Sequence, residues 1–234
     1  MHYTDLFQLP QRKDIVVTSI WHFALLHAGS LQSPQRKDLV IAGEWDPALL
    51  QMLIREHIPE SLQPLLSNPL YHNPVWHEFS LMQHIHMVIE AAKRMLLMTG
   101  IDVVIPAAFH DLGKLLQFES AVTTGNYQFA GHEDLSVQIA QEYGQDSNVQ
   151  FLVLYHDIPY QHRTDRIFLK LCKGDVDKLR HLLTMAACDT AGKGWTKAQH
   201  TQRPEIATKF QWICEDAGLD PAFTEVIQRA CLEW

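Results

Sequence analysis

The chain has no long apolar run. No stretch of its 234 residues approaches the roughly 18 consecutive apolar residues that a membrane-spanning helix needs. Its first residues, Met1-His-Tyr-Thr-Asp5, also lack the charged segment and apolar core that mark a signal peptide. We therefore expect a cytoplasmic protein with no membrane partner.

Cysteine is scarce as well. The four cysteines, Cys172, Cys188, Cys214 and Cys231, are spread over the C-terminal half, and no two form a Cys-x-x-Cys pair. This spacing argues against a disulfide framework and against a cysteine-rich structural zinc site. We predict reduced and mostly buried thiols.

Basic charge is also in deficit. Lysine and arginine total 19 against 27 acidic residues, and the net charge is −8. An extended nucleic-acid-binding surface is therefore not expected, although a local basic patch remains open. Histidine, in contrast, is abundant at 14 residues. It is the commonest metal ligand and the usual proton shuttle in proteins.

Alternating strand patterns are missing after residue 45, and apolar residues recur with helical spacing instead. Before that point, residues 10–17 recur almost unchanged as residues 34–41, each copy a polar turn followed by a β-branched run. Short strands and helix starts both remain open for these copies. We favour a solvated turn over a phosphate contact for their basic residues, Arg12, Lys13, Arg36 and Lys37.

The spacing of apolar residues, caps and glycines predicts roughly eight to ten helices and an all-α fold. The expected helices span residues 47–56, 79–99, 102–115, 132–143, 147–156, 164 onward, 175–189, 196–217 and 220 onward. A turn is expected at 122–127 and a loop at 157–163. We divide the chain into an N-terminal extension (1–65), a core (66–195) and C-terminal helices that pack on the core (196–234).

One predicted helix ends in an unusual polar pair. The segment Ala107-Ala-Phe-His-Asp-Leu-Gly-Lys114 runs from apolar residues directly into His110 and Asp111. Burying an imidazole beside a carboxylate is costly unless both are satisfied, and a divalent metal would satisfy both at once.

Further candidate ligands lie near the ends or on the apolar sides of other predicted helices, positions that can converge inside a helical bundle. The candidate set is His84, His110, Asp111, His132, His156 and Asp189. Imidazole and carboxylate ligands suit Mn, Fe, Co, Ni or Zn and, with more oxygen, Mg. Six ligands exceed what one tetrahedral ion needs. One ion, or two ions about 3.5–4 Å apart with Asp111 as the bridge, both remain open.

The order His84, His110-Asp111, Asp189 resembles the HD-domain superfamily of metal-dependent phosphohydrolases. That resemblance implies an HD-type helical domain in which these four residues hold the core metal. His132 and His156 stand where some subfamilies place ligands of a second ion, although a phosphate contact remains the alternative. Lys114 stands where such subfamilies place a lysine that faces the substrate phosphate.

Within the superfamily, Tyr71-His-Asn-Pro74 and Gly131-His-Glu133 look most like the HD domain of bacterial CCA-adding tRNA nucleotidyltransferases. The nucleotidyltransferase head of those enzymes is absent here. The likeness covers only about residues 70–195.

The resemblance implies a phosphomonoesterase or cyclic phosphodiesterase that uses metal-activated water on a nucleotide or on an RNA-terminal phosphate. Asp111 and Lys114 would carry the chemistry. A (deoxy)nucleoside mono- or triphosphate hydrolase is the alternative enzyme, and a non-catalytic nucleotide-binding sensor or interaction domain is the alternative of another class.

Four further residues are assigned supporting roles. His72 and His77 are candidates for the substrate pocket, against a plain loop role. Glu133 and Asp157 each follow a candidate ligand, so either can orient an imidazole or shuttle a proton. The tryptophans near the candidate site in sequence, Trp76 and Trp195, are predicted to be core residues rather than platforms on which a base stacks.

Overall fold

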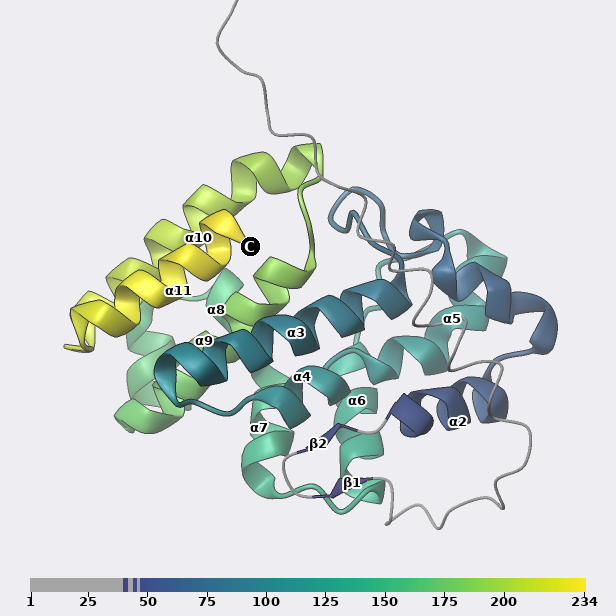
Figure 1. The fold of residues 1–234 in the computed structure, drawn as a ribbon, viewed down its shortest axis with the longest axis horizontal. Coiled ribbons are helices and arrows are strands. Elements are labelled where there is room, and N and C mark those ends of the chain that lie inside the picture. Colours follow the sequence, from purple (N-terminus) through teal and green to yellow (C-terminus); the bar gives the residue numbers. More distant parts are fainter. Residues whose placement is uncertain (1–39, 42–43, 46) are drawn as a thin grey trace, which may run out of the picture. The chain divides into compact units, whose positions relative to one another are not determined.

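The computed structural model describes residues 40–41, 44–45 and 47–234, all within one compact unit (Figure 1). This part of the chain is all-α, as predicted. Its β structure is one antiparallel pair of two-residue strands, β1 (Val40–Ile41) and β2 (Glu44–Trp45). The first copy of the sequence repeat and most of the second lie outside the described residues.

The helices follow one another with short connections. Their bounds are α2 (Pro47–His57), α3 (Leu81–Thr99), α4 (Val104–Phe109), α5 (Leu112–Thr124), α6 (His132–Glu142), α7 (Ser147–Tyr155), α8 (Ile158–Gln161), α9 (Val176–Gly192), α10 (Lys197–Asp216) and α11 (Pro221–Glu233). Two 3₁₀ segments, η2 (Glu60–Ser67) and η3 (Pro69–Tyr71), connect α2 to α3, and a π-helical segment, η4 (Asp165–Leu171), precedes α9.

Capping residues set several helix ends where the sequence predicts them. Ser80 and Gln83 form a capping box at the start of α3, and Gly100 ends that helix with a φ of 73°. The side chains of Asp175, Thr196 and Asp220 accept backbone N–H bonds at the starts of α9, α10 and α11.

Four local predictions were wrong. The helix expected over 102–115 is two helices, because the chain breaks at His110-Asp111. The turn expected at 122–127 begins later, since α5 continues to Thr124. The loop expected at 157–163 contains α8. Thr164, expected to cap the helix from residue 164 onward, makes no side-chain cap, because its backbone is already helical.

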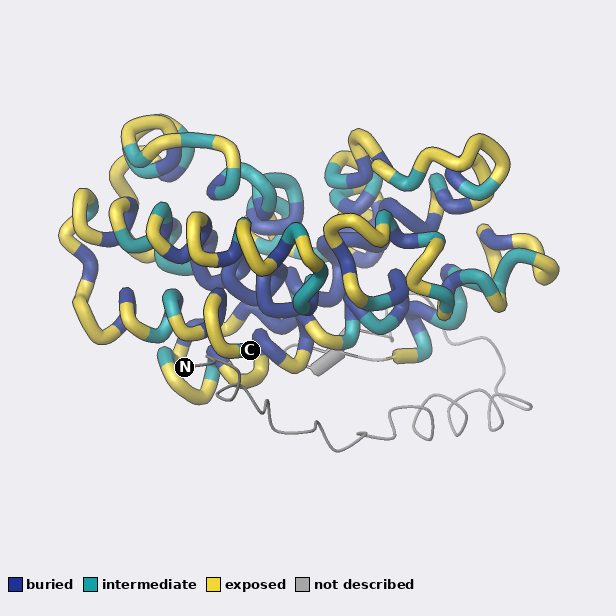
Figure 2. Tube along the Cα trace, turned by 90° about the horizontal axis from the view of Figure 1, so that it is seen from above, coloured by how far each residue is buried: buried dark blue, intermediate teal, exposed yellow. Residues whose placement is uncertain are grey.

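The core is built on α3 and α9, which pack along each other and are covered by α4, α7 and α11. Figure 2 shows the buried positions gathered through the middle of the described helices. Gly192 allows this close approach. A Cβ at that position would overlap the Val88 side chain on α3.

A second glycine brings α5 against α6. A Cβ on Gly113 would overlap the backbone of α6 at His132 and Ser136. The Gly113 N–H donates to Ser136 Oγ at 2.8 Å, and that hydroxyl donates to the His110 carbonyl at 2.7 Å. The contact therefore fixes the chain on both sides of Asp111.

The C-terminal helices are attached through the buried Arg203 on α10. Its guanidinium donates to four backbone carbonyls, those of Gly194, Ala230, Cys231 and Trp234, and lies 3.8 Å from the centroid of the Trp195 ring. The arginine thus binds the end of α11 to the turn after α9.

The four cysteines are free and buried, as predicted. Among the described helices, none is long and apolar enough to cross a membrane. The domain boundaries at residues 65 and 195 stay predictions.

Candidate metal centre

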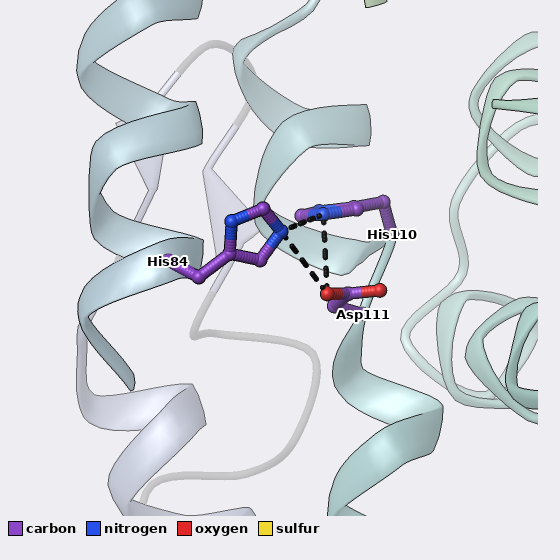
Figure 3. Close-up of side chains that lie close together, drawn as sticks. All are labelled: His84, His110 and Asp111. Carbon is purple, nitrogen blue, oxygen red and sulfur yellow. Dashed lines mark hydrogen bonds and ion pairs between the residues drawn. The ribbon is translucent and has the colours of Figure 1, made fainter. Parts of the chain in front are cut away.

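The break between α4 and α5 lets the side chains of His110 and Asp111 point toward the same group of candidate ligands. His110 caps the end of α4, and Asp111 opens α5 with φ −110° and ψ 5°. Consecutive side chains of an uninterrupted helix diverge by about 100°. The break removes that divergence, and both side chains face His84 on α3 (Figure 3).

Four buried histidines share one orientation. The Nδ1 atom of each is within hydrogen-bond distance of a backbone carbonyl: His84 with Gly192 (3.0 Å), His110 with Ala107 (2.7 Å), His132 with Phe129 (2.9 Å) and His156 with Val153 (2.8 Å). Because a carbonyl only accepts, Nδ1 carries the proton and each neutral ring presents a lone pair on Nε2. This is the arrangement that metal-ligating histidines normally show.

One group of acceptor atoms forms around His84. Its Nε2 lies 3.2 Å from both Asp111 Oδ2 and Asp189 Oδ1. His110 Nε2 lies 3.5 and 3.6 Å from the same two oxygens and 3.2 Å from His84 Nε2. The four residues predicted to hold the core metal are therefore brought together.

A second group lies on the other side of Asp111. The remaining oxygen, Oδ1, is 3.0 Å from His132 Nε2. Ligand atoms of Asp111, His132 and His156 all lie within 4.8 Å of one another. Asp111 therefore belongs to both groups and directs one oxygen to each histidine cluster, as a bridging ligand would.

Each central carboxylate also holds a lysine. Lys114 Nζ is 2.6 Å from Asp111 Oδ2, and Lys193 Nζ is 2.6 Å from Asp189 Oδ2. Tyr160 adds a hydroxyl 2.8 Å from the latter oxygen, and the Lys193 ammonium lies 4.2 Å from the centroid of the Tyr160 ring.

These contacts keep the carboxylates ionised. Burial alone would raise the pKa of Asp111, but the adjacent His110 ring and the Lys114 ammonium hold that pKa well below its usual range. Asp189 is likewise buried, and the ammonium of Lys193 keeps its pKa well below normal. Without a metal, a proton on His84 Nε2 takes the place of the cation: burial opposes this charge, but hydrogen bonds to the two carboxylates raise the pKa of His84.

The donor set fits a divalent cation. Carboxylate oxygens and imidazole nitrogens face one another at 3.2–3.6 Å, and the two buried carboxylates favour positive charge between them. Among the described residues, the buried His132 Nε2 has only the Asp111 Oδ1 contact at 3.0 Å, which lacks the geometry of a hydrogen bond. A divalent ion would supply the missing charge and use these lone pairs. Because no cysteine takes part, the set is typical of Mn, Fe, Co, Ni, Zn or Mg sites rather than of closed structural zinc sites.

The ligand groups open into a cavity of about 460 Å³, a volume typical of small-molecule sites. His72 and His77, predicted to lie in the pocket, are buried and line it. Their rings stack with centroids 3.9 Å apart, and His72 Nε2 is 3.4 Å from Lys114 Nζ. Lys114, the candidate for facing the substrate phosphate, therefore lines the cavity beside His72.

The two predicted supporting carboxylates lie on different sides of their histidines. Glu133 is 3.4 Å from His132 Nδ1, the side from which a ring can be oriented. Asp157 is 3.7 Å from His156 Nε2, the side of the lone pair. The Nδ1 proton of each histidine goes to a backbone carbonyl, so an orienting role of either carboxylate stays a prediction. Asp157 lines the cavity, a position compatible with a proton-shuttle role, and that role stays a prediction.

Sequence reasoning missed three residues of the site. Lys193 follows Asp189 by four positions, a spacing that places two side chains on one helix face, and this signal was available. Tyr160 lies in the segment expected to be a loop and gave no signal. Trp76, predicted to be a core residue, is 41% exposed and lines the cavity.

Comparison with protein families adds to this geometry. Residues 81–190 match the HD domain family. This segment includes all six candidate ligands, and the family usually consists of metal-dependent hydrolases. No curated protein and no solved structure matched the chain.

Proposed function

We propose that the protein is a metal-dependent phosphohydrolase that removes a phosphate monoester, or opens a cyclic phosphodiester, on a nucleotide or an RNA end. The observation that carries this proposal is the position of Asp111, which is shared by two ligand groups and paired with Lys114 at the wall of a cavity. A bound divalent metal would supply Lewis acidity and lower the pKa of a bound water toward neutrality.

The residues of the chain have separate tasks in this proposal. His84, His110, Asp111 and Asp189 would hold one ion, and His132 and His156, with Asp111, would hold a second. Lys114 and Lys193 would neutralise charge that develops on the phosphoryl oxygens, because both side chains line the cavity beside the ligand groups.

Asp157 is the candidate for moving protons. It is half-buried in the cavity wall, beside a ligand histidine but outside the close contacts around Asp111. A carboxylate there can accept a proton from water or return one to the leaving oxygen. Our preference for a nucleotide or RNA end rests on the likeness of Tyr71-His-Asn-Pro74 and Gly131-His-Glu133 to the HD domain of CCA-adding enzymes.

The test begins with metal content and turnover. The chelator-treated protein is loaded separately with Mn, Co, Ni and Mg and assayed on p-nitrophenyl phosphate, bis-p-nitrophenyl phosphate and 2′,3′-cyclic nucleotides. We expect activity with at least one ion and none without metal.

Matched variants connect that activity to the site. Asp111→Asn should lower metal-dependent turnover more than about 100-fold, since even outer partners of metal ligands are worth about 10–100-fold. Asp177→Asn is the control, because this aspartate lies on α9 with its side chain 82% exposed. A protein that binds no metal and hydrolyses none of these esters would contradict the proposal and favour a sensor.

A further inference from the structure

One wall of the cavity is aromatic and held rigidly. Trp76 is 41% exposed and follows an exposed turn, and its backbone N–H donates to the Asn73 carbonyl at 3.0 Å. Gln199 Nε2 donates to the Trp76 carbonyl at 2.8 Å, and Thr196 Oγ1 donates to the Val75 carbonyl at 2.8 Å. The tryptophan therefore stands at the cavity on a turn that α10 holds in place.

The same cavity is lined by amides rather than by further charges. Five carboxamide side chains line it: Asn73, Gln128, Gln161, Gln199 and Gln202. An amide both donates and accepts, as the edge of a nucleobase does. Since the Trp76 carbonyl only accepts, Gln199 must turn its nitrogen toward it, and its Oε1 is left buried without a hydrogen-bond partner in the described chain.

Apart from a bound metal, positive charge in the cavity is limited. Among the described residues, its only lysine or arginine side chains are Lys114 and Lys193, and each is already paired with an aspartate. One terminal phosphate carries about 1.5–2 negative charges at neutral pH. A polyphosphate or a polynucleotide backbone carries more, and the lining offers no further lysine or arginine for it.

Together these features divide the cavity into two parts. The ligand groups and the two lysines suit one phosphate, and the tryptophan with its amides suits an uncharged aromatic heterocycle. We propose that the cavity binds a nucleoside monophosphate whose base stacks on Trp76, so that this residue selects nucleotides over other phosphate monoesters. This inference rests on the proposed function and specifies its substrate class.

The test compares phosphate monoesters with and without a base. Values of kcat/KM are measured for the four 5′-ribonucleoside monophosphates and for ribose 5-phosphate, with the full-length, metal-loaded protein. Stacking of a base on an aromatic side chain is worth roughly 5–150-fold. We expect at least one nucleotide to be preferred over ribose 5-phosphate by about this factor.

Three variants test whether Trp76 causes the preference for nucleotides. Trp76→Ala should remove most of it by raising KM for the nucleotide more than KM for ribose 5-phosphate. Trp76→Phe should keep most of it, because a smaller ring still stacks. Trp212→Ala is the matched control, since Trp212 is 61% exposed on α10 and lines a different groove.

Two results would overturn the inference: equal kcat/KM for nucleotides and ribose 5-phosphate, or an unchanged preference in Trp76→Ala. Calorimetric titration of the same ligands separates this failure from that of the proposed function. If no ester is hydrolysed, nucleotide binding that weakens in Trp76→Ala but not in Trp212→Ala still supports the base site. Absence of any such difference rejects it.

Discussion

Substituting Gly192 by alanine tests the packing that assembles the metal centre. This residue is the last of α9, where the helix meets α3. A Cβ there would overlap the Val88 side chain, lie 3.1 Å from the Val88 backbone nitrogen and lie 3.3 Å from His84 Nδ1. The Gly192 carbonyl also accepts the His84 Nδ1 proton. The added methyl group therefore acts on the core and on a candidate ligand together.

The expected change in stability is a difference between two effects. Overfilling a close-packed contact costs about 1–3 kcal/mol. Alanine recovers up to about 1 kcal/mol of helix propensity over glycine, and less at a helix end. We expect a net loss of about 1–2 kcal/mol in the free energy of unfolding. Because His84 is displaced from its carbonyl, metal affinity should fall by about 10–100-fold, the usual effect of losing such a partner.

Urea unfolding of the metal-free protein measures the first quantity, and calorimetric metal titration measures the second. Val88→Ala provides the control within a double-mutant cycle. Alone it should cost about 2 kcal/mol through lost burial and a cavity. The double variant Val88→Ala/Gly192→Ala should lose about 1 kcal/mol less free energy of unfolding than the sum of the two single variants, because the overlapping methyl group of Val88 is gone. Wild-type stability together with wild-type metal affinity in Gly192→Ala would refute the close approach of α3 and α9.

Two further predictions concern the C-terminal helices. Arg203→Met should lower the free energy of unfolding by at least about 3 kcal/mol, because three buried carbonyls and one half-buried carbonyl lose their donor. The exposed Arg229→Met, on α11, should change it by less than about 0.5 kcal/mol in the same urea assay. Burial raises the pKa of Cys214 to about 11 and that of Cys231 to about 12, so the unfolded thiols, with a pKa of roughly 8.5, ionise first as the pH rises. Stability contributed by these thiols is therefore complete below about pH 8.5 and is lost toward pH 11–12. Unfolding at pH 8 and pH 10 should show this loss, and Cys231→Ala should reduce it; equal slopes in the variant and the wild type would contradict the assignment.

Local sequence signals were sufficient for most of the fold. Helix starts at Asp175, Thr196 and Asp220 and the helix end at Gly100 were predictable, because a side-chain cap or a left-handed glycine acts within a few residues. The break at His110-Asp111 was not, because apolar residues continue on both sides of it. There, tertiary contacts from Ser136 on another helix hold the chain open.

The sequence by itself determined which residue types are available: histidines and aspartates on several helices, cysteines spaced too widely for a structural zinc site, and a lysine one turn after Asp111. Tertiary structure alone decided their geometry. The two oxygens of Asp111 face different histidine clusters, and Trp76 lies at the cavity rather than in the core. These relations depend on the distances between helices that are far apart in the chain. Those distances are set by close packing at Gly113 and Gly192, which no local pattern records.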